Sequence, residues 1–342
     1  MNQALIDLTA LREPCADQVT QAIYAKHGAQ LQRFGERGRN TCRRDILHHL
    51  DYLQAALSNN APNILVQYAL WLRDVLSSRG VPAQHLGFSF ELLIDFFAMR
   101  LSADQSEPLK AIIEAALFAL DKLAPPALIE KSRLPALPEM DVYQSLVLQG
   151  HHRPAYSVLN KAMDAGHSLA QVSVQMVQPA LYQVGHLWQK SQITVSQEHL
   201  ATAISQNVLA SAYMRASFAP PVGKSAMFAC VEGNHHCVGL QMLSDAFETS
   251  GWDVFNLGSD LPMMDLIRQV DAQRPDLLGL SIMLPHHAAV ARITIETLRA
   301  EMGTACPTIW VGGLPTVTTP ELWEATKADG WAADALHALE QL

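Results

Sequence analysis

The most constraining feature of the sequence is a turn between a short apolar run and a helical pattern. Phe228–Val231 reads as a buried strand, and residues 238–247 carry apolar side chains at helical spacing. Between them, Asn234, His236 and Gly239 form the pattern Asn-x-His-x-x-Gly. The histidine therefore lies at the carboxyl end of a strand, where open parallel sheets bind ligands. An imidazole there is a good metal ligand, and a glycine lets a bulky group lie against the backbone.

This pattern resembles the Asp-x-His-x-x-Gly signature of cobalamin-binding domains. Three further strand-end motifs follow in the order of that family, at residues 251–258, 277–281 and 308–313. The resemblance covers Ser225 to about Leu342. It implies a C-terminal flavodoxin-like (Rossmann-like) α/β domain over residues 220–342, with His236 coordinating cobalt from below. The other cofactor-binding residues that it implies here are Asn234, His235, Gly239, Ser281, Met283, Gly312 and Gly313.

Two departures from the family pattern bear on the metal ligand. Asn234 replaces the usual acid, so the partner that orients His236 and raises its basicity is weaker. His235 is adjacent and could compete as ligand, but the spacing to Gly239 favours His236. Two alternatives stay open: both histidines line a polar loop, or a heme replaces cobalamin, with His286-His287 on the next loop contributing.

A second signal lies upstream, in a region that reads as four helices. From Asp141 to Tyr213, helical patterns are separated by breaks at Gly150, Gly166 and Ile193. Four helices of this length form a small bundle, which we place at residues 139–219. Ser168 is a candidate N-cap, and Pro179 lies inside a helical pattern, where it predicts a kink.

Nine residues separate Trp188 from the pair Glu198-His199, in a segment that includes Val195. This spacing resembles the helical cap of CarH-type adenosylcobalamin light sensors. The resemblance implies that Trp188 covers the upper face of the corrin, with Val195 also in the site, and that Glu198 contacts the adenosyl group. It also implies that His199 is the replacement cobalt ligand after illumination. The alternative is an ordinary core tryptophan followed by a polar pair at a helix N-terminus.

Composition limits the class of protein. The 342 residues suffice for two or three domains, and a net charge of −9 argues against a nucleic-acid-binding face. The one basic-rich stretch, residues 31–44, reads as a solvated helix end or loop. We see no membrane span of about 18 apolar residues, no signal-peptide pattern and no disulfide framework among the five cysteines. We therefore expect a cytoplasmic protein that does not contact the membrane.

Residues 1–124 read as a helical domain, broken at residues 60–62 and 79–82, with a linker over residues 125–138. No segment reads as a DNA-recognition helix, so we expect no direct DNA binding. The helices carry a polar-aromatic set: Asp45, His48, His49, Asp51, Tyr52, Tyr68, Trp71 and His85. This set resembles photocobilin-type sensors, which implies a bilin such as biliverdin as second chromophore. The alternative is a dimerisation or signalling domain whose histidines are exposed, with a second copy or another protein as partner.

Together these patterns predict an α plus α/β protein that binds adenosylcobalamin between the cap and the C-terminal domain. We expect a photoreceptor in which light breaks the cobalt–carbon bond and changes domain packing, without catalytic turnover. The main alternative is a corrinoid methyl carrier of a methyltransferase system, whose cobalt must stay open to partners.

Overall fold

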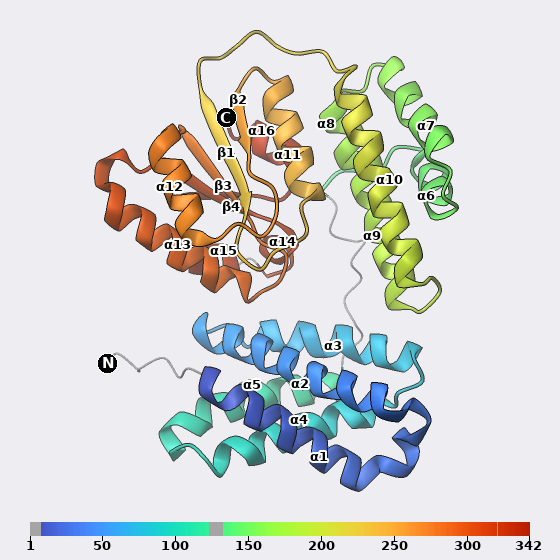
Figure 1. Ribbon diagram of the computed structural model, residues 1–342, viewed down its shortest axis with the longest axis vertical. Coiled ribbons are helices and arrows are strands. Elements are labelled where there is room, and N and C mark those ends of the chain that lie inside the picture. Colours follow the sequence, from blue (N-terminus) through green and yellow to red (C-terminus); the bar gives the residue numbers. More distant parts are fainter. Residues whose placement is uncertain (1–7, 123–132, 320) are drawn as a thin grey trace. The chain divides into compact units, whose positions relative to one another are not determined.

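The computed structural model describes residues 8–122, 133–319 and 321–342. The chain divides into two compact units, Met1–Pro126 and Ala127–Leu342. Figure 1 shows that the first unit is helical, whereas the second combines a helical cap with a sheet covered by helices. The predicted fold class, α plus α/β with a flavodoxin-like domain, is therefore confirmed.

The first unit is built of long amphipathic helices. The breaks predicted at residues 60–62 and 79–82 fall between helices: Asn60 and Gly80 both have positive φ, and each is followed two residues later by a proline. The helices and short 3-10 turns are η1 (Thr9–Leu11), α1 (Arg12–Leu31), η2 (Gln32–Phe34), α2 (Gly35–Ser58), α3 (Asn63–Ser78), α4 (Ala83–Ala98) and α5 (Ala103–Lys122).

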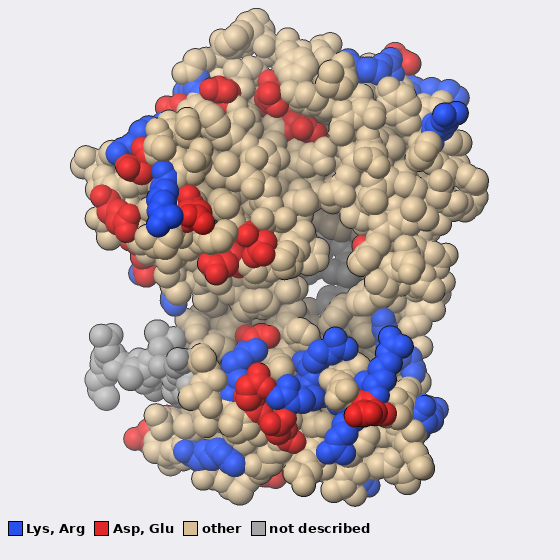
Figure 2. Space-filling model, in the orientation of Figure 1, with Lys and Arg blue, Asp and Glu red and all other residues tan. Residues whose placement is uncertain are grey.

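Basic side chains gather on the visible face of the first unit (Figure 2). Two arginines of this unit already have partners: Arg43 pairs with Glu13 and Asp17, and the Arg39 guanidinium lies over the Tyr24 ring. This arrangement agrees with a solvated helix face. Among the described residues, no helix is both long enough and apolar enough to cross a membrane.

The second unit begins with the cap. Its helices are α6 (Met140–Leu148), α7 (His152–Asp164), α8 (Leu169–Val172), a π-helical turn (Ser173–Val177), α9 (Gln178–Gln189) and α10 (Val195–Tyr213). Ser168 caps α8 as predicted, since its side chain accepts from Gln171 N while the Gln171 side chain accepts from Ser168 N. Thr194 and Gln197 form the same capping box at the start of α10.

Pro179 leaves a distinct trace in the cap. Because proline has no N–H, the carbonyl four residues earlier, at Gln175, loses its partner within the helix. The Leu137 N–H donates to that carbonyl instead, at 2.8 Å. The helix is irregular at this point, with a π-helical turn immediately before α9, while the kink at Pro179 stays a prediction. The cap core is mainly apolar, and within it the buried Tyr143 hydroxyl donates to Ser205 Oγ at 3.0 Å.

The remainder of the second unit is a doubly wound α/β domain. Its strands are β1 (Ser225–Cys230), β2 (Asp253–Asn256), β3 (Leu277–Ser281), β4 (Thr308–Gly312) and β5 (Gly330–Ala332), in the order β2-β1-β3-β4-β5 and all parallel. Its helices are α11 (Val238–Thr249), α12 (Met263–Gln273), α13 (His287–Met302), α14 (Leu314–Thr318), α15 (Glu321–Thr326) and α16 (Ala335–Glu340), with a 3-10 turn at Gly303–Ala305.

The sheet topology fixes where a ligand can bind. The chain leaves β1 for one edge, at β2, and then returns to the other side, at β3, so the switch point lies between β1 and β3. Ligands of such folds bind outside the carboxyl ends of the strands at that point. In the register of the sheet, Ser281 lies opposite both Cys230 and Gly312. The predicted motifs at the ends of β1, β3 and β4 therefore lie side by side at the carboxyl edge of the sheet.

Candidate functional site

The turn after β1 is anchored by a single buried amide. Asn234 is fully buried, and its Nδ2 donates to the Ser281 carbonyl at 3.0 Å. Its Oδ1 accepts from the His236 backbone N–H at 3.1 Å, and its own N–H donates to Val231 O at 3.0 Å. One side chain thus joins the end of β3 to the histidine turn. An aspartate could accept from His236 in the same way, but it could not donate to Ser281.

The His236 ring is oriented by the same amide. Its Nδ1 lies 3.3 Å from Asn234 Oδ1, which favours the tautomer with the proton on Nδ1 and leaves the Nε2 lone pair for a ligand. Burial lowers the pKa of His236, and the neighbouring His235 acts in the same direction, while Glu198 opposes them. The neutral ring that results is the form in which histidine binds metals.

His235 is placed differently from its neighbour. Its side chain is 74% exposed, and its Nδ1 is 3.9 Å from Asp260 Oδ2. Asp260 itself holds the turn from the β2–α12 loop, since its Oδ1 accepts from Gly233 N at 2.8 Å and its N–H donates to Asn234 O at 2.9 Å. The Asp260 carboxylate therefore lies beside His235, whereas the Asn234 amide lies beside His236.

The predicted glycines have two different surroundings. A Cβ at Gly239 would meet no atom within 4 Å, so there is open space beside the first turn of α11. A Cβ at Gly313, where φ is +124°, would lie 1.8 Å from Ile282 O, and one at Gly312 would lie 3.0 Å from Ala332 O. Gly313 is thus required by its close contact with the Ile282 backbone, whereas a side chain at Gly312 would need a small shift of the end of β5. Ser281 and Met283 lie half-buried beside them.

The cap contributes the start of α10. Glu198 contacts two neighbouring side chains of this helix: its Oε1 accepts from Thr202 Oγ1 at 3.0 Å, and its Oε2 contacts His199 Nδ1. The His199 side chain is 74% exposed, and Val195, one turn before it, is 50% exposed. Trp188 is half-buried near the end of α9, so it is not a fully buried core side chain.

The cap and the α/β domain meet at the histidine turn. Glu198 lies close enough to raise the pKa of His236, although the two residues come from different halves of this unit. Farther along α10, Gln206 Nε2 contacts Cys237 Sγ at 3.7 Å. Val238 and Met242 of α11 pack into the cap core. The structure therefore brings the predicted upper residue Glu198 and the predicted lower ligand His236 to one side of the cap–sheet junction.

Comparison with known families agrees with this geometry. Residues 224–340 match a family described as B12 binding domain, and residues 141–213 match a second family with the same description. Residues 141–213 and 224–340 belong to two families of B12-binding domains. The chain is therefore a cobalamin-binding protein, with a helical and an α/β B12-binding domain in tandem.

Individual relatives fall into two groups. The chain is 30% identical over 184 residues to the HTH-type transcriptional repressor CarH of Myxococcus xanthus, a match over 52% of this chain and 60% of that protein. It is 28% identical over 110 residues to dimethylamine corrinoid protein 3 of Methanosarcina acetivorans, over 32% of this chain and 50% of that protein. The match thus spans less than two thirds of either curated relative. The structure of the Methanosarcina barkeri monomethylamine corrinoid protein aligns at 17% identity with a TM-score of 0.49, over 59% of this chain and 98% of that one.

The sequence patterns named His287 only for the heme alternative and did not predict that it is buried. His287, the first residue of α13, is 1% exposed, and its Nδ1 accepts from the N–H groups of Met283 and Leu284, both at 3.2 Å. Burial lowers its pKa to about 4, with His286, His236 and His235 adding to the effect. Its position directly after the β3 loop, at the carboxyl edge of the sheet, is the sequence signal that could have identified it.

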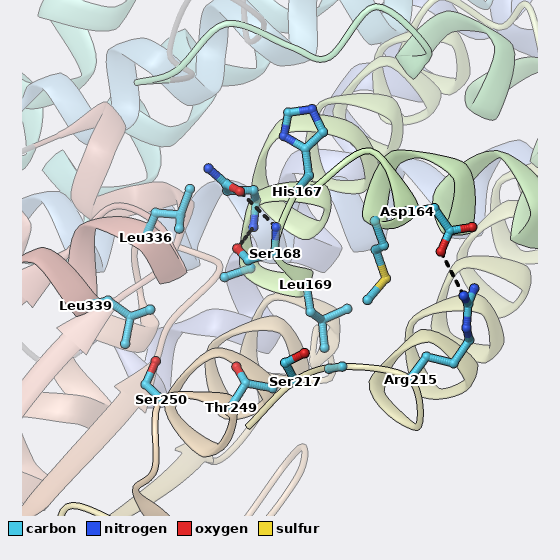
Figure 3. A pocket seen from close by; sticks show the side chains of 15 residues that line it. Asp164, His167, Ser168, Leu169, Arg215, Ser217, Thr249, Ser250, Leu336 and Leu339 are labelled. Carbon is cyan, nitrogen blue, oxygen red and sulfur yellow. Dashed lines mark hydrogen bonds and ion pairs between the residues drawn. The ribbon is translucent and has the colours of Figure 1, made fainter. Parts of the chain in front are cut away.

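A pocket of about 510 Å³ lies at the opposite end of the cap–sheet junction (Figure 3). It is lined by the end of α7, the start of α8, the residues that follow α10, the end of α11 and one side of α16. There Arg215 pairs with Asp164 at 2.9 Å, and Leu336 and Leu339 form an apolar side. Arg215 lies just beyond the end of α10, and the 15 residues from Glu198 to Tyr213 correspond to roughly 22 Å at the helical rise. This pocket is therefore separate from the histidine turn.

The polar-aromatic set of the first unit forms a layer between α2, α3 and α4. His49 is buried, with Nδ1 2.8 Å from the Tyr68 hydroxyl and Nε2 3.3 Å from Ser89 Oγ. Tyr52 stacks on Tyr68 with ring centroids 3.9 Å apart, and Trp71 continues the layer at 6.1 Å. Burial lowers the pKa of His49 to about 3. At the edges, His48 lies 3.7 Å from Asp51, and His85 packs edge-on against His27.

Proposed function

We propose that this protein is a cobalamin-dependent photoreceptor that holds adenosylcobalamin between the cap and the α/β domain. His236 is the lower cobalt ligand, and Trp188, Val195, Glu198 and His199 form the upper side. The adenosyl form supplies a light-sensitive cobalt–carbon bond when bound. The protein acts as a binding and switching device without turnover.

The donor set of the site fits cobalamin. Among the described residues, no group of three or more His, Cys, Asp or Glu side chains is arranged to hold a metal ion by itself. A corrin brings four ring nitrogens to its cobalt, so a single histidine from the protein suffices. His236 offers an outward Nε2, Gly239 has open space beside it, and Val195 presents exposed apolar surface.

The observation that carries the proposal is the contact of α10 with the histidine turn, where Gln206 Nε2 lies 3.7 Å from Cys237 Sγ, next to His236. This contact supports the proposal because Glu198 and His199 stand on the same helix, two turns before Gln206. Glu198 keeps two fixed partners, Thr202 and His199, and can accept from a ribose hydroxyl with its remaining lone pairs. His199 is exposed, so its side chain would be free to reorient and could serve as a second nitrogen ligand if the upper group were lost.

Switching would use the contact between α11 and the cap. Met242 and Val238 of α11 share one apolar cluster with α9 and α10, so a shift of the Trp188 helix changes this packing directly. The π-helical turn before α9 is the irregular point at which such a shift can be absorbed. A light-induced loss of the upper group would thereby favour a second arrangement of cap and α/β domain.

The test is reconstitution of the purified protein in darkness with adenosylcobalamin, methylcobalamin or heme, each followed by an absorption spectrum before and after green light. We expect the tightest binding for adenosylcobalamin and a permanent spectral change after illumination. Much tighter binding of methylcobalamin, without a lasting light effect, would replace this proposal with the methyl-carrier function. A heme spectrum without cobalamin binding would contradict both.

The methyl-carrier alternative has its own support in the similarity to dimethylamine corrinoid proteins. It needs a cobalt face that partner proteins can reach. Removing the large upper side chain by Trp188→Ala separates the two functions. A photoreceptor should then lose retention of the adenosyl form, while a carrier should keep its affinity for the methyl form.

For the first unit we propose a bilin site or, failing that, a docking face for a second copy or a protein partner. Supporting a bilin, the half-buried rings of Tyr52 and Trp71, on either side of the buried Tyr68, offer aromatic surface near the ion pair of Asp51 and Arg12. Added biliverdin should produce a red-absorbing band that is absent after deletion of residues 1–124. An unchanged spectrum would leave the docking role, checked by the oligomeric state in darkness and light. In either case we propose no direct DNA binding.

A further inference from the structure

His287 packs against the histidine turn, and one of its two ring nitrogens, Nδ1, already has its hydrogen-bond partners. Its Nδ1 accepts two backbone hydrogen bonds, from Met283 and Leu284, and therefore carries no proton. The proton of the neutral ring must then be on Nε2. The imidazole is held rigidly, because both donors belong to the loop that connects β3 to α13 and the side chain is 1% exposed.

The Nε2–H of His287 has no hydrogen-bond partner within the described part of the chain. It points at the turn, since a Cβ built on Gly233 would lie 3.9 Å from it. The Gly233 backbone favours the protonated ring as a hydrogen-bond acceptor, so its carbonyl faces Nε2 without reaching full hydrogen-bond geometry. A buried donor in this position requires a specific explanation.

We propose that His287 is a positioning residue for the lower cobalt ligand: its Nε2–H takes the Gly233 carbonyl as acceptor when His236 binds cobalt, and thereby fixes the turn. This inference rests on the proposed role of His236. The turn already has two anchors, Ser281 through Asn234 and Asp260 through the Gly233 N–H. Gly233 has a φ of +84°, which glycine adopts without strain, and a small adjustment of the turn closes the remaining contact while the Asn234 N–H stays on Val231 O. His287 then supplies the third anchor.

The substitutions that test this role are His287→Leu, which removes both ring nitrogens, and His287→Gln, whose amide can accept and donate at similar positions. The matched control is His337→Leu. His337 likewise lies in the first turn of a helix, and its Nδ1 accepts a hydrogen bond from the Ala333 backbone N–H at 3.1 Å. It belongs to α16 and not to the β3–α13 loop. Each full-length variant is titrated with adenosylcobalamin in darkness, and the cobalt(II) form is examined by EPR for coupling to one histidine nitrogen.

We expect His287→Leu to weaken adenosylcobalamin binding about tenfold, as for other partners that orient a metal ligand, and to reduce the histidine-nitrogen coupling. His287→Gln should restore both, and His337→Leu should change neither. Coupling and affinity unchanged in His287→Leu, or equally lost in His287→Gln, would overturn the proposal. If His287→Leu does not fold, the ring ¹H–¹⁵N NMR spectrum of the wild-type protein decides. It must show the Nε2–H tautomer, with that proton shifted on cobalamin binding, and any other result rejects the role. Absence of histidine coupling in the wild type would instead refute His236 as ligand.

Discussion

The Asn234 amide nitrogen donates to the Ser281 carbonyl at 3.0 Å, which ties the histidine turn after β1 to the end of β3. The relatives' signature has an acid where this chain has Asn234. The amide serves two opposite needs, because Oδ1 accepts from His236 while Nδ2 donates to Ser281. The replacement of the acid is therefore part of a different local anchoring and is more than a weaker partner for His236.

Asn234→Asp should destabilise the protein, although it restores the family's residue. A buried carboxylate would face the Ser281 carbonyl, costing about 1–3 kcal/mol for the lost and unsatisfied groups. This repulsion and burial raise the pKa of the new carboxyl, so the free energy of unfolding should fall as pH rises through that pKa. Urea unfolding at pH 5 and pH 8 measures it. Asn256→Asp is the control, since the Asn256 side chain accepts from Gly258 N, a role that aspartate keeps.

His236→Ala should weaken cobalamin binding by at least about tenfold, whereas His235→Ala should change it by about twofold or less. The physical difference is that Asn234 orients His236, while the side chain of His235 is 74% exposed beside Asp260. Titration followed by the absorption spectrum separates the two. The reverse order of effects would move the ligand assignment by one residue.

His199→Ala should leave affinity in darkness within about twofold, because this side chain is 74% exposed. Its effect should appear only after green light, when the illuminated spectrum no longer shows a second histidine on cobalt. His152→Ala, at an exposed histidine elsewhere in the cap, should behave like the wild type. An identical illuminated spectrum in His199→Ala would remove this residue from the photochemical role.

Asp245 should make stability depend on pH. Its Oδ2 is buried and has no hydrogen-bond partner among the described residues, and burial, with Glu248 adding to it, raises its pKa from 3.8 to about 7. The folded state therefore binds more protons between these values, and the free energy of unfolding falls as pH rises from about 4 to about 7, by at most about 4 kcal/mol. Asp245→Asn should flatten this dependence in urea unfolding. Asp253→Asn, on the exposed edge of β2, should leave its slope unchanged.

Tyr68→Phe should destabilise the first unit by about 1–3 kcal/mol. The substitution removes the 2.8 Å hydrogen bond to His49 and leaves a buried ring nitrogen without that partner. Thermal unfolding of the full-length protein, followed by near-ultraviolet circular dichroism, measures the change. Tyr24→Phe, nearer the surface under Arg39, should have a much smaller effect, and equal effects would argue against a special role of the His49 contact.

The sequence alone determined the class and order of the elements. Apolar runs of strand length alternate with helical patterns after residue 224, and this is enough to predict a parallel α/β domain. Gly and Pro marked the helix breaks, and Ser168 marked an N-cap, because these effects act over a few residues. The strand-end motifs also predicted which residues reach the carboxyl edge, since parallel strands all end there.

The tertiary structure decided the contacts between residues far apart in the chain. Ser281 is 47 residues from Asn234, and no local pattern shows that an amide is needed there to donate to a strand-end carbonyl. The carbonyl freed by Pro179 is likewise taken by Leu137, and the burial of His287 and Asp245 depends on what packs over them. Hydrogen bonding and desolvation of a buried polar group depend on its complete surroundings, which only the folded chain supplies.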